Sequence, residues 1–196
     1  MWWTHRRGSE RNRRMRAERE RHELERRCAA LVGDVLRGVR YVEGDYAEPL
    51  WNVEADYDSI DQGLELDMQS GRTFAFFWAS GAVDFEMNVA EGEVPVIEGV
   101  PRLDVGGTSR WTPLLGRQVT ACRVLWRPIE GTSNEIASQT IRLDFDGDRV
   151  LVTAAEFDGV GPVGADHVSV FFGDAWERRS DLTGEIDKLS IEEPHA

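Results

Sequence analysis

Two turn signals, each inside a segment of alternating apolar and polar residues, constrain the fold of this 196-residue chain more than any other feature. The first turn is Ser70-Gly71, within residues 63–79, and the second is Asp146-Gly147-Asp148, within residues 141–155. Alternation with a period of two on both sides of a glycine-containing turn is typical of a β-hairpin. The sequence therefore predicts two pairs of antiparallel strands.

The rest of the chain predicts further strands and one helix. Period-two segments predict strands over residues 117–126 and 167–172, and residues 90–107 are expected to form a surface loop with at most a short strand at 94–97. Before the strands, apolar residues recur at three- and four-residue spacing, which predicts a helix over about residues 10–38 that ends at Gly38. The apolar positions of this helix are Leu24, Cys28, Leu31, Val32, Val35, Leu36 and Val39.

Helical patterns between the strands are weak, apart from a turn around residues 111–115, so the strand–helix alternation of a parallel sheet is absent. The expected fold class is α+β, with an N-terminal helix packed on a mainly antiparallel β-sheet. With 41% hydrophobic residues, the chain is sufficient for one domain. We expect residues 1–20 to be an Arg-rich projecting arm, residues 21–180 to be the single α+β domain and residues 181–196 to be a polar tail. Met15 is an alternative translation start.

Charge is distributed unevenly along the chain. The formal net charge is −13, but residues 1–27 contain ten Arg and five Glu, so residues 28–196 carry −18. An acidic body argues against binding to duplex nucleic acid, and the alternation of Arg with Glu in the arm is typical of a solvated helix. No apolar run approaches the roughly 18 residues that would span a membrane, and the first residues contain no apolar signal segment. We therefore expect a cytoplasmic protein without a membrane partner.

Few residues are suited to catalysis or to metal binding. His167 follows Asp166 and is the one histidine with the setting of a general base, although a histidine on an edge strand beside a turn is the commoner arrangement. The acidic sequence from Asp144 to Asp148 lacks the spacing of a calcium-binding loop and fits a hairpin turn better. Cys28 and Cys122 give no framework for disulfides or zinc. We expect no catalytic residue, no metal and no cofactor.

The most distinctive composition lies between Tyr41 and Gly71. This stretch contains nine acidic residues, no Lys or Arg, and all three tyrosines of the chain together with Trp51. Acidic charge steers a basic partner and aromatic side chains provide buried anchors, so this is the composition of an interface. The alternative is that the acids solvate strand faces and the aromatics fill the core. The residues predicted to bind a partner are Tyr46, Trp51, Asp56, Tyr57, Asp58 and Asp61.

Four segments of the chain resemble a family of uncharacterised bacterial proteins common in actinobacteria. They are residues 57–66, Gly71–Phe74 with Trp78, residues 109–119 and residues 165–172, and the resemblance covers about residues 40–175. In size, acidity and lack of catalytic residues, this family is similar in type to the immunity proteins of polymorphic toxin systems, which are cytoplasmic antidotes that bind one toxin domain. The resemblance assigns a role to no individual residue.

Three functions compete at this point. The first is a non-enzymatic binding protein, most concretely an immunity-type inhibitor that blocks a basic toxin domain such as a nuclease through residues 41–71. The second is a small-molecule or carbohydrate binder, or a cryptic enzyme, that uses tryptophans around a concave sheet. The third is an assembly module in which the charged N-terminal helix forms a coiled coil. The oligomeric state does not follow from the sequence.

Deletion of residues 1–20 is expected to leave a folded domain, because this segment has no apolar stripe to bury. Thermal unfolding of the truncated and full-length proteins measures the effect. A large decrease in the midpoint temperature would show that the segment belongs to the core.

Overall fold

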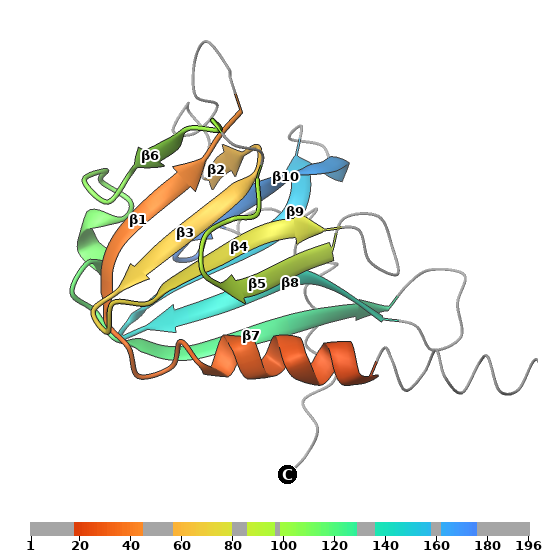
Figure 1. Ribbon diagram of the computed structural model, residues 1–196, viewed down its shortest axis with the longest axis horizontal. Coiled ribbons are helices and arrows are strands. Elements are labelled where there is room, and N and C mark those ends of the chain that lie inside the picture. The colour runs from red at the N-terminus through yellow and green to blue at the C-terminus, as the bar shows by residue number, and fades with distance from the viewer. Residues whose placement is uncertain are drawn as a thin grey trace, which may run out of the picture.

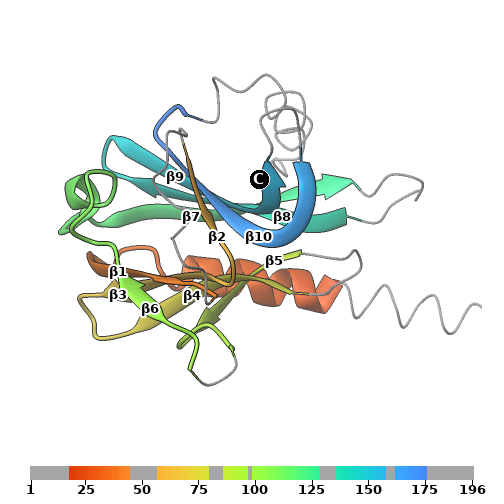
Figure 2. The same ribbon diagram turned by 90° about the horizontal axis from the view of Figure 1, so that it is seen from above.

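Two antiparallel sheets, packed face to face, make up most of the fold (Figures 1 and 2). The structure is a computed structural model, and it describes residues 18–44, 57–79, 86–96, 99–128, 136–157 and 162–175. The fold class predicted from the sequence, α+β with an N-terminal helix on mainly antiparallel strands, is confirmed. The strands form two layers where the sequence predicted one sheet.

Apart from β2, the strands of the first half of the chain form one sheet and those of the second half form the other. The first sheet has the order β5-β4-β3-β1-β6, and the second has the order β2-β10-β9-β8-β7. The first sheet consists of β1 (Leu36–Val42), β3 (Gly63–Met68), β4 (Thr73–Ala79), β5 (Glu86–Glu91) and β6 (Arg102–Asp104). The second consists of β2 (Tyr57–Ile60), β7 (Val119–Pro128), β8 (Ile136–Phe145), β9 (Asp148–Phe157) and β10 (Pro162–Phe172). A short 3-10 helix, η1 (Thr112–Leu114), precedes β7 and corresponds to the predicted turn.

Both predicted hairpins are confirmed. Strands β3 and β4 pair through the turn that contains Gly71, and β8 and β9 pair through the turn that contains Gly147. These two glycines have φ angles of 87° and 82°, in the left-handed region that side chains with a Cβ atom disfavour. The turns therefore depend on glycine. Within the segment expected to be a surface loop, residues 94–96 form no strand, and the short strand β6 lies instead at residues 102–104, which the sequence did not predict.

The N-terminal helix ends earlier than its apolar pattern predicted. Within the described residues it covers 18–29, a turn follows, and Gly33 has a φ angle of 90° that stops the helix. Gly38, the predicted stop, lies inside β1. The prediction failed because a spacing of four residues, as between Val35 and Val39, fits a strand as well as a helix.

The core lies between the two sheets. Alternate residues of the central strands point inward and are buried, as the period of two requires. Examples are Leu64, Leu66 and Met68 on β3, Phe74 and Phe76 on β4, Val150, Val152 and Ala154 on β9, and Val168 and Val170 on β10. The apolar faces therefore cover each other.

The helix closes one open edge of this sandwich. It packs against β5 and β7, which are edge strands of the first and the second sheet (Figure 1). Leu24 and Cys28 of the helix and Leu31 of the turn that follows it belong to the core. Arg27 donates from Nη1 to the main-chain oxygen of Val89 at 3.0 Å. This contact fixes the helix to β5.

Two further connections join the sheets. Before β1, the main chain bonds to the start of β7: the Gly33 nitrogen donates to the Val119 oxygen at 2.8 Å, and the Val119 nitrogen donates to the Asp34 oxygen at 2.9 Å. At another corner, β2 of the second sheet leads through Asp61 and Gln62 directly into β3 of the first. The two layers are thus held by hydrogen bonds and by chain connectivity.

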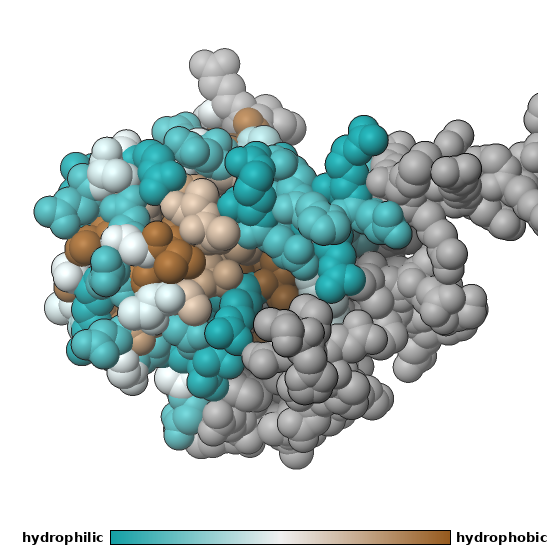
Figure 3. Space-filling view, turned by 90° about the horizontal axis from the view of Figure 1, so that it is seen from below, coloured by the Kyte–Doolittle hydropathy of each residue, from teal (hydrophilic) through white to brown (hydrophobic). Residues whose placement is uncertain are grey.

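The described surface is largely polar. Seen from below, it shows hydrophilic residues around a hydrophobic area (Figure 3). Val32 is the large hydrophobic side chain of the described residues that is exposed, with 46% of its surface accessible. Within the same part of the chain, no helix has the length and apolar character that would span a membrane.

Substitution Leu31→Ala is expected to lower the free energy of unfolding by about 3 kcal/mol, because the side chain is fully buried where the helix meets the sandwich. Substitution Val32→Ala at the exposed neighbour is the control, with an expected change of less than about 0.5 kcal/mol. Urea unfolding measures both. Equal effects would contradict the docking of this segment through Leu31.

Candidate functional site

The predicted partner-binding residues divide into two groups. Tyr46, Trp51 and Asp56 lie outside the described residues. Tyr57 and Asp58 lie on β2, and Asp61 lies in the turn that joins β2 to β3. The structure thus places three of the six residues, at one corner of the sandwich.

Asp58 points into the protein and is buried, with 3% of its surface exposed. The Tyr41 hydroxyl donates to its Oδ2 at 2.6 Å, and Arg110 forms an ion pair with its other oxygen. Trp111 donates from Nε1 to the Tyr41 hydroxyl at 2.7 Å. The interpretation of Asp58 as part of an uncompensated acidic surface is therefore wrong, because Arg110 balances its charge inside the protein.

This buried network also controls the Tyr41 hydroxyl. Burial raises the pKa of Tyr41 well above its usual value, and the negative charge of Asp58 raises it further. The hydroxyl therefore stays protonated and serves as a donor to the carboxylate. Tyr41 lies on β1, Asp58 on β2 and Trp111 just before η1, so the network links the two sheets.

Tyr57 and Asp61 are both half-buried. The Tyr57 ring stacks on Phe171 of β10, with 5.0 Å between the ring centroids and 27° between the planes. The Asp61 carboxylate accepts from Gln62 Nε2 at 2.8 Å, and its main-chain oxygen accepts from Trp78 Nε1 at 2.9 Å. Both residues are held by these contacts and keep part of their surface accessible.

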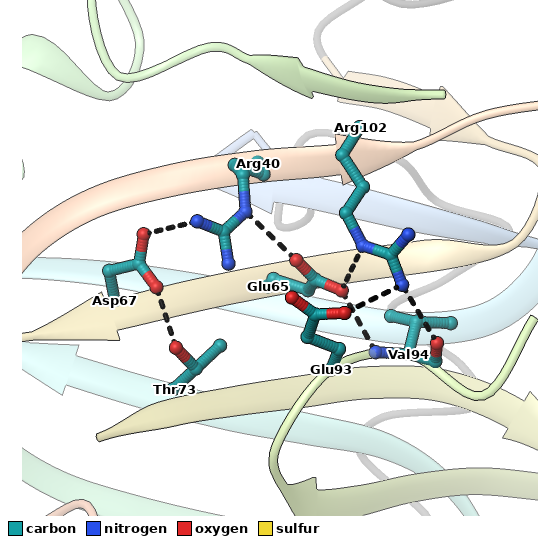
Figure 4. Close-up of polar contacts among 7 residues, drawn as sticks. All are labelled: Arg40, Glu65, Asp67, Thr73, Glu93, Val94 and Arg102. Carbon is teal, nitrogen blue, oxygen red and sulfur yellow. Dashed lines mark hydrogen bonds and ion pairs between the residues drawn. The ribbon is translucent and has the colours of Figure 1, made fainter. Parts of the chain in front are cut away.

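Two more acids of the stretch, Glu65 and Asp67, lie on the outer face of the first sheet (Figure 4). Glu65 is fully buried and accepts from Arg40 Nε at 2.9 Å and from Arg102 Nε at 3.0 Å. The Val94 nitrogen donates to the same carboxylate at 2.9 Å. A segment of the predicted surface loop therefore covers Glu65, and Val94 is buried with it.

Asp67 is compensated in the same way. It accepts from Arg40 Nη1 at 2.7 Å and from Thr73 Oγ1 at 2.7 Å (Figure 4). Burial alone would lower the pKa of Arg40, but the hydrogen bond to Glu65 and the charges of Asp67 and Glu65 raise it. The absence of Lys and Arg between residues 41 and 71 thus does not leave these acids unpaired. Arginines from within β1 and from β6 approach them in space.

The count of charges over residues 41–71 left out Arg40, which pairs with acids of that stretch. It precedes the acidic stretch by one residue in the sequence and lies across from Glu65 in the β1–β3 pair. Counting charges over a window of sequence missed this contact, because the partners of a strand residue lie on the neighbouring strand.

Glu43 differs from all these acids. It follows β1 directly and is buried, with 4% of its surface exposed. Its Oε2 accepts from the Asp61 main-chain nitrogen at 3.2 Å, whereas its Oε1 has no hydrogen-bond partner among the described residues. An unpartnered buried carboxylate oxygen is costly and marks a position that is suited to a further donor.

The ionisation of Glu43 reflects this setting. Burial, together with the charges of Asp61 and Asp58, raises its pKa from 4.5 to about 7, although the hydrogen bond from the Asp61 main chain and the charge of His167 oppose the shift. The carboxyl group is therefore divided between its neutral and charged forms near pH 7. A strongly shifted carboxyl group is a recognised property of functional sites.

Glu43 was one of nine acids in the sequence and was not distinguished from the others. The signal that could have identified it is the alternation of β1: Val39 and Tyr41 point inward, and the same period continues to residue 43. A glutamate at the next inward position should be buried.

His167 lies near this group but not as predicted. It is buried and belongs to β10, which lies between β2 and β9, so the interpretation as an edge-strand histidine is wrong. Its neighbour Val168 pairs with Ile60, which places His167 beside the β2–β3 turn. We refer to Glu43, Asp61 and His167 together as the β1–β2 corner.

The other predicted positions have structural roles. Asp144 accepts from Arg142 Nε at 2.8 Å and from Arg149 Nε at 3.3 Å, beside the hairpin turn. Within the described ranges, no group of three or more His, Cys, Asp or Glu side chains could hold a metal ion. Trp111 is fully buried, and Trp78 and Trp126 pack against the core. These three tryptophans are therefore core or core-edge residues, and Trp176 lies outside the described residues.

Comparison with known proteins identifies no relative. No family model, no curated protein and no solved structure matches the chain.

Substitution Glu43→Gln is expected to stabilise the protein at pH 8 and to have little effect at pH 4. Below the unfolded-state pKa of 4.5 the buried carboxyl group is neutral and does not reduce the free energy of unfolding. As the pH rises through about 7, the wild-type protein loses stability because this group becomes charged while buried. The shift in the pKa of Glu43 corresponds to a loss of about 3 kcal/mol in the free energy of unfolding between pH 4 and pH 8. Glutamine cannot ionise and avoids this loss.

Denaturant unfolding of wild type and variant at both pH values measures the effect. Substitution Glu91→Gln, at an exposed residue, is the matched control for loss of one charge. A difference between wild type and Glu43→Gln that does not change with pH would contradict the shifted ionisation of Glu43.

Proposed function

We propose that this protein is a non-enzymatic cytoplasmic binding protein for a basic protein partner, of the type of an immunity protein that inhibits a toxin domain such as a nuclease. The observation that carries the proposal is Glu43: a buried carboxylate with one oxygen that has no partner among the described residues. In its charged form this carboxylate adds to the negative charge of Asp61 beside it, and a cationic group of the partner at the surface would complement that charge.

The sequence between Gly44 and Tyr57, which lies outside the described residues, adds more acidic charge. Residues 45–56 contain four acids and no Lys or Arg, and this segment is joined covalently to Gly44, beside Glu43, and to Tyr57 on β2. Asp61 contributes its half-buried carboxylate in the next turn. Together these groups favour the approach of a basic partner over about a Debye length, roughly 8 Å at physiological salt.

The proposed interface differs from the set that the sequence predicted. Asp58 is removed from it, because its carboxylate is buried and paired with Arg110. Glu43 is added, and Tyr57 and Asp61 are retained. Tyr46, Trp51 and Asp56 remain part of the proposal as aromatic and acidic residues of the segment between Gly44 and Tyr57.

The expected test result is a slower association of the partner with a double variant, Glu43→Gln with Asp61→Asn, and a weaker dependence of its association rate on salt. A partner is first captured and identified with the full-length protein and is then purified for kinetic measurement at low and high salt. An inhibited nuclease activity of that partner would support the immunity role. Long-range attraction acts mainly on the association rate.

The control is a second double variant, Glu86→Gln with Glu91→Gln on β5, which also removes two acidic side chains but away from the β1–β2 corner. Circular dichroism confirms that both variants are folded. If both variants slow association equally, net charge alone acts and the β1–β2 corner is not the interface. If neither does, the proposal is wrong.

A further inference from the structure

The two cysteines of the chain lie together although they are distant in the sequence. Cys28 is in the last turn of the N-terminal helix, and Cys122 is on β7. Both are free thiols and belong to the core, with 1% and 9% of their surfaces exposed. No sequence pattern pairs them, since two isolated cysteines define no spacing.

Contacts on both sides hold the helix and β7 together at this point. Earlier in the helix, the Arg21 guanidinium lies 5.2 Å from the centroid of the Trp126 ring. After the helix, the Gly33 nitrogen donates to the Val119 oxygen at 2.8 Å. The segment from Arg21 to Gly33 and the segment from Val119 to Trp126 therefore run in opposite directions. Cys28 and Cys122 each lie slightly past the middle of their segment, counted from the Arg21–Trp126 contact. Both side chains belong to the same core cluster.

We propose that Cys28 and Cys122 form a dithiol site that a peroxide oxidises to a disulfide, which then fixes the helix covalently to β7. This inference is independent of the proposed function, because it involves neither the β1–β2 corner nor a partner.

The reaction balances with hydrogen peroxide as the oxidant. The more exposed Cys122 loses its proton, its sulfur attacks one peroxide oxygen, and the O–O bond breaks to give a sulfenic acid and hydroxide, which takes up the proton as water. The Cys28 sulfur then attacks the sulfenic sulfur, the S–O bond breaks, and a second water leaves with the Cys28 proton. Two thiols and one peroxide give one disulfide and two water molecules.

The setting of the thiols determines how fast this reaction runs. The neighbouring Cys28 thiol and burial raise the pKa of Cys122 well above its usual value. Because the thiolate is the nucleophile, the rate should increase as the pH rises. The product closes a long loop of the chain, so oxidation should raise the midpoint of thermal unfolding.

The experiment treats the folded full-length protein with hydrogen peroxide, blocks the remaining thiols with N-ethylmaleimide, and measures the intact mass and the cysteine peptides. The expected product has lost two hydrogen atoms, contains a Cys28–Cys122 linked peptide, melts at a higher temperature and reverts with dithiothreitol. Variants Cys28→Ser and Cys122→Ser are the controls and should give no intramolecular product.

Two outcomes would overturn the proposal. In one, the folded wild-type protein gains only oxygen atoms or stays unchanged, while the linked peptide forms only in urea. In the other, the linked product melts at the same or a lower temperature than the reduced protein. The wild-type measurements decide between these results even if a serine variant does not fold.

Discussion

The contact between the inner faces of the two sheets is the interaction on which the rest of the structure depends. Each sheet presents alternate apolar residues on one face, and neither face could remain in water at an acceptable free energy. Packing the faces together leaves the edge between β5 and β7 open, and the helix covers it with Leu24 and Cys28, followed by Leu31 in the next turn. The helix is therefore a part of the core, and the contact between Cys28 and Cys122 follows from its position.

The buried carboxylates Asp58 and Glu65 lie where the fold brings arginines to them. Arg110 compensates Asp58 between the sheets, and Arg40 and Arg102 compensate Glu65 on the outer face of the first sheet. These pairs fix the strands relative to one another, because removal of one member would leave a buried charge without a partner. Glu43 departs from the rule among the described acids, since one of its oxygens has no partner there and its pKa is about 7. Burial of the Glu43 carboxylate without a full set of partners lowers the free energy of unfolding, and the binding role that we propose for Glu43 accounts for its presence.

The acidic stretch thus serves two purposes that composition alone could not separate. Part of it stabilises the fold through arginines of neighbouring strands, and part of it remains at the β1–β2 corner, where the proposed basic partner would bind. The dithiol site lies elsewhere, between the helix and β7, so oxidation and partner binding involve different contacts. Stabilising the helix by a disulfide would not change the groups that the interface uses.

The sequence by itself determined the local elements: the Gly71 and Gly147 turns, the flanking strands and the α+β class. These follow from residues within a few positions of one another, where the period and the turn chemistry act. It misplaced the end of the helix, because a four-residue spacing fits both periods. Only the tertiary structure decided that the strands form two sheets, that Asp58 meets Arg110, and that Glu43 keeps an unpartnered oxygen. Those contacts join residues far apart in the chain, and they depend on the order of the strands, which no local pattern encodes.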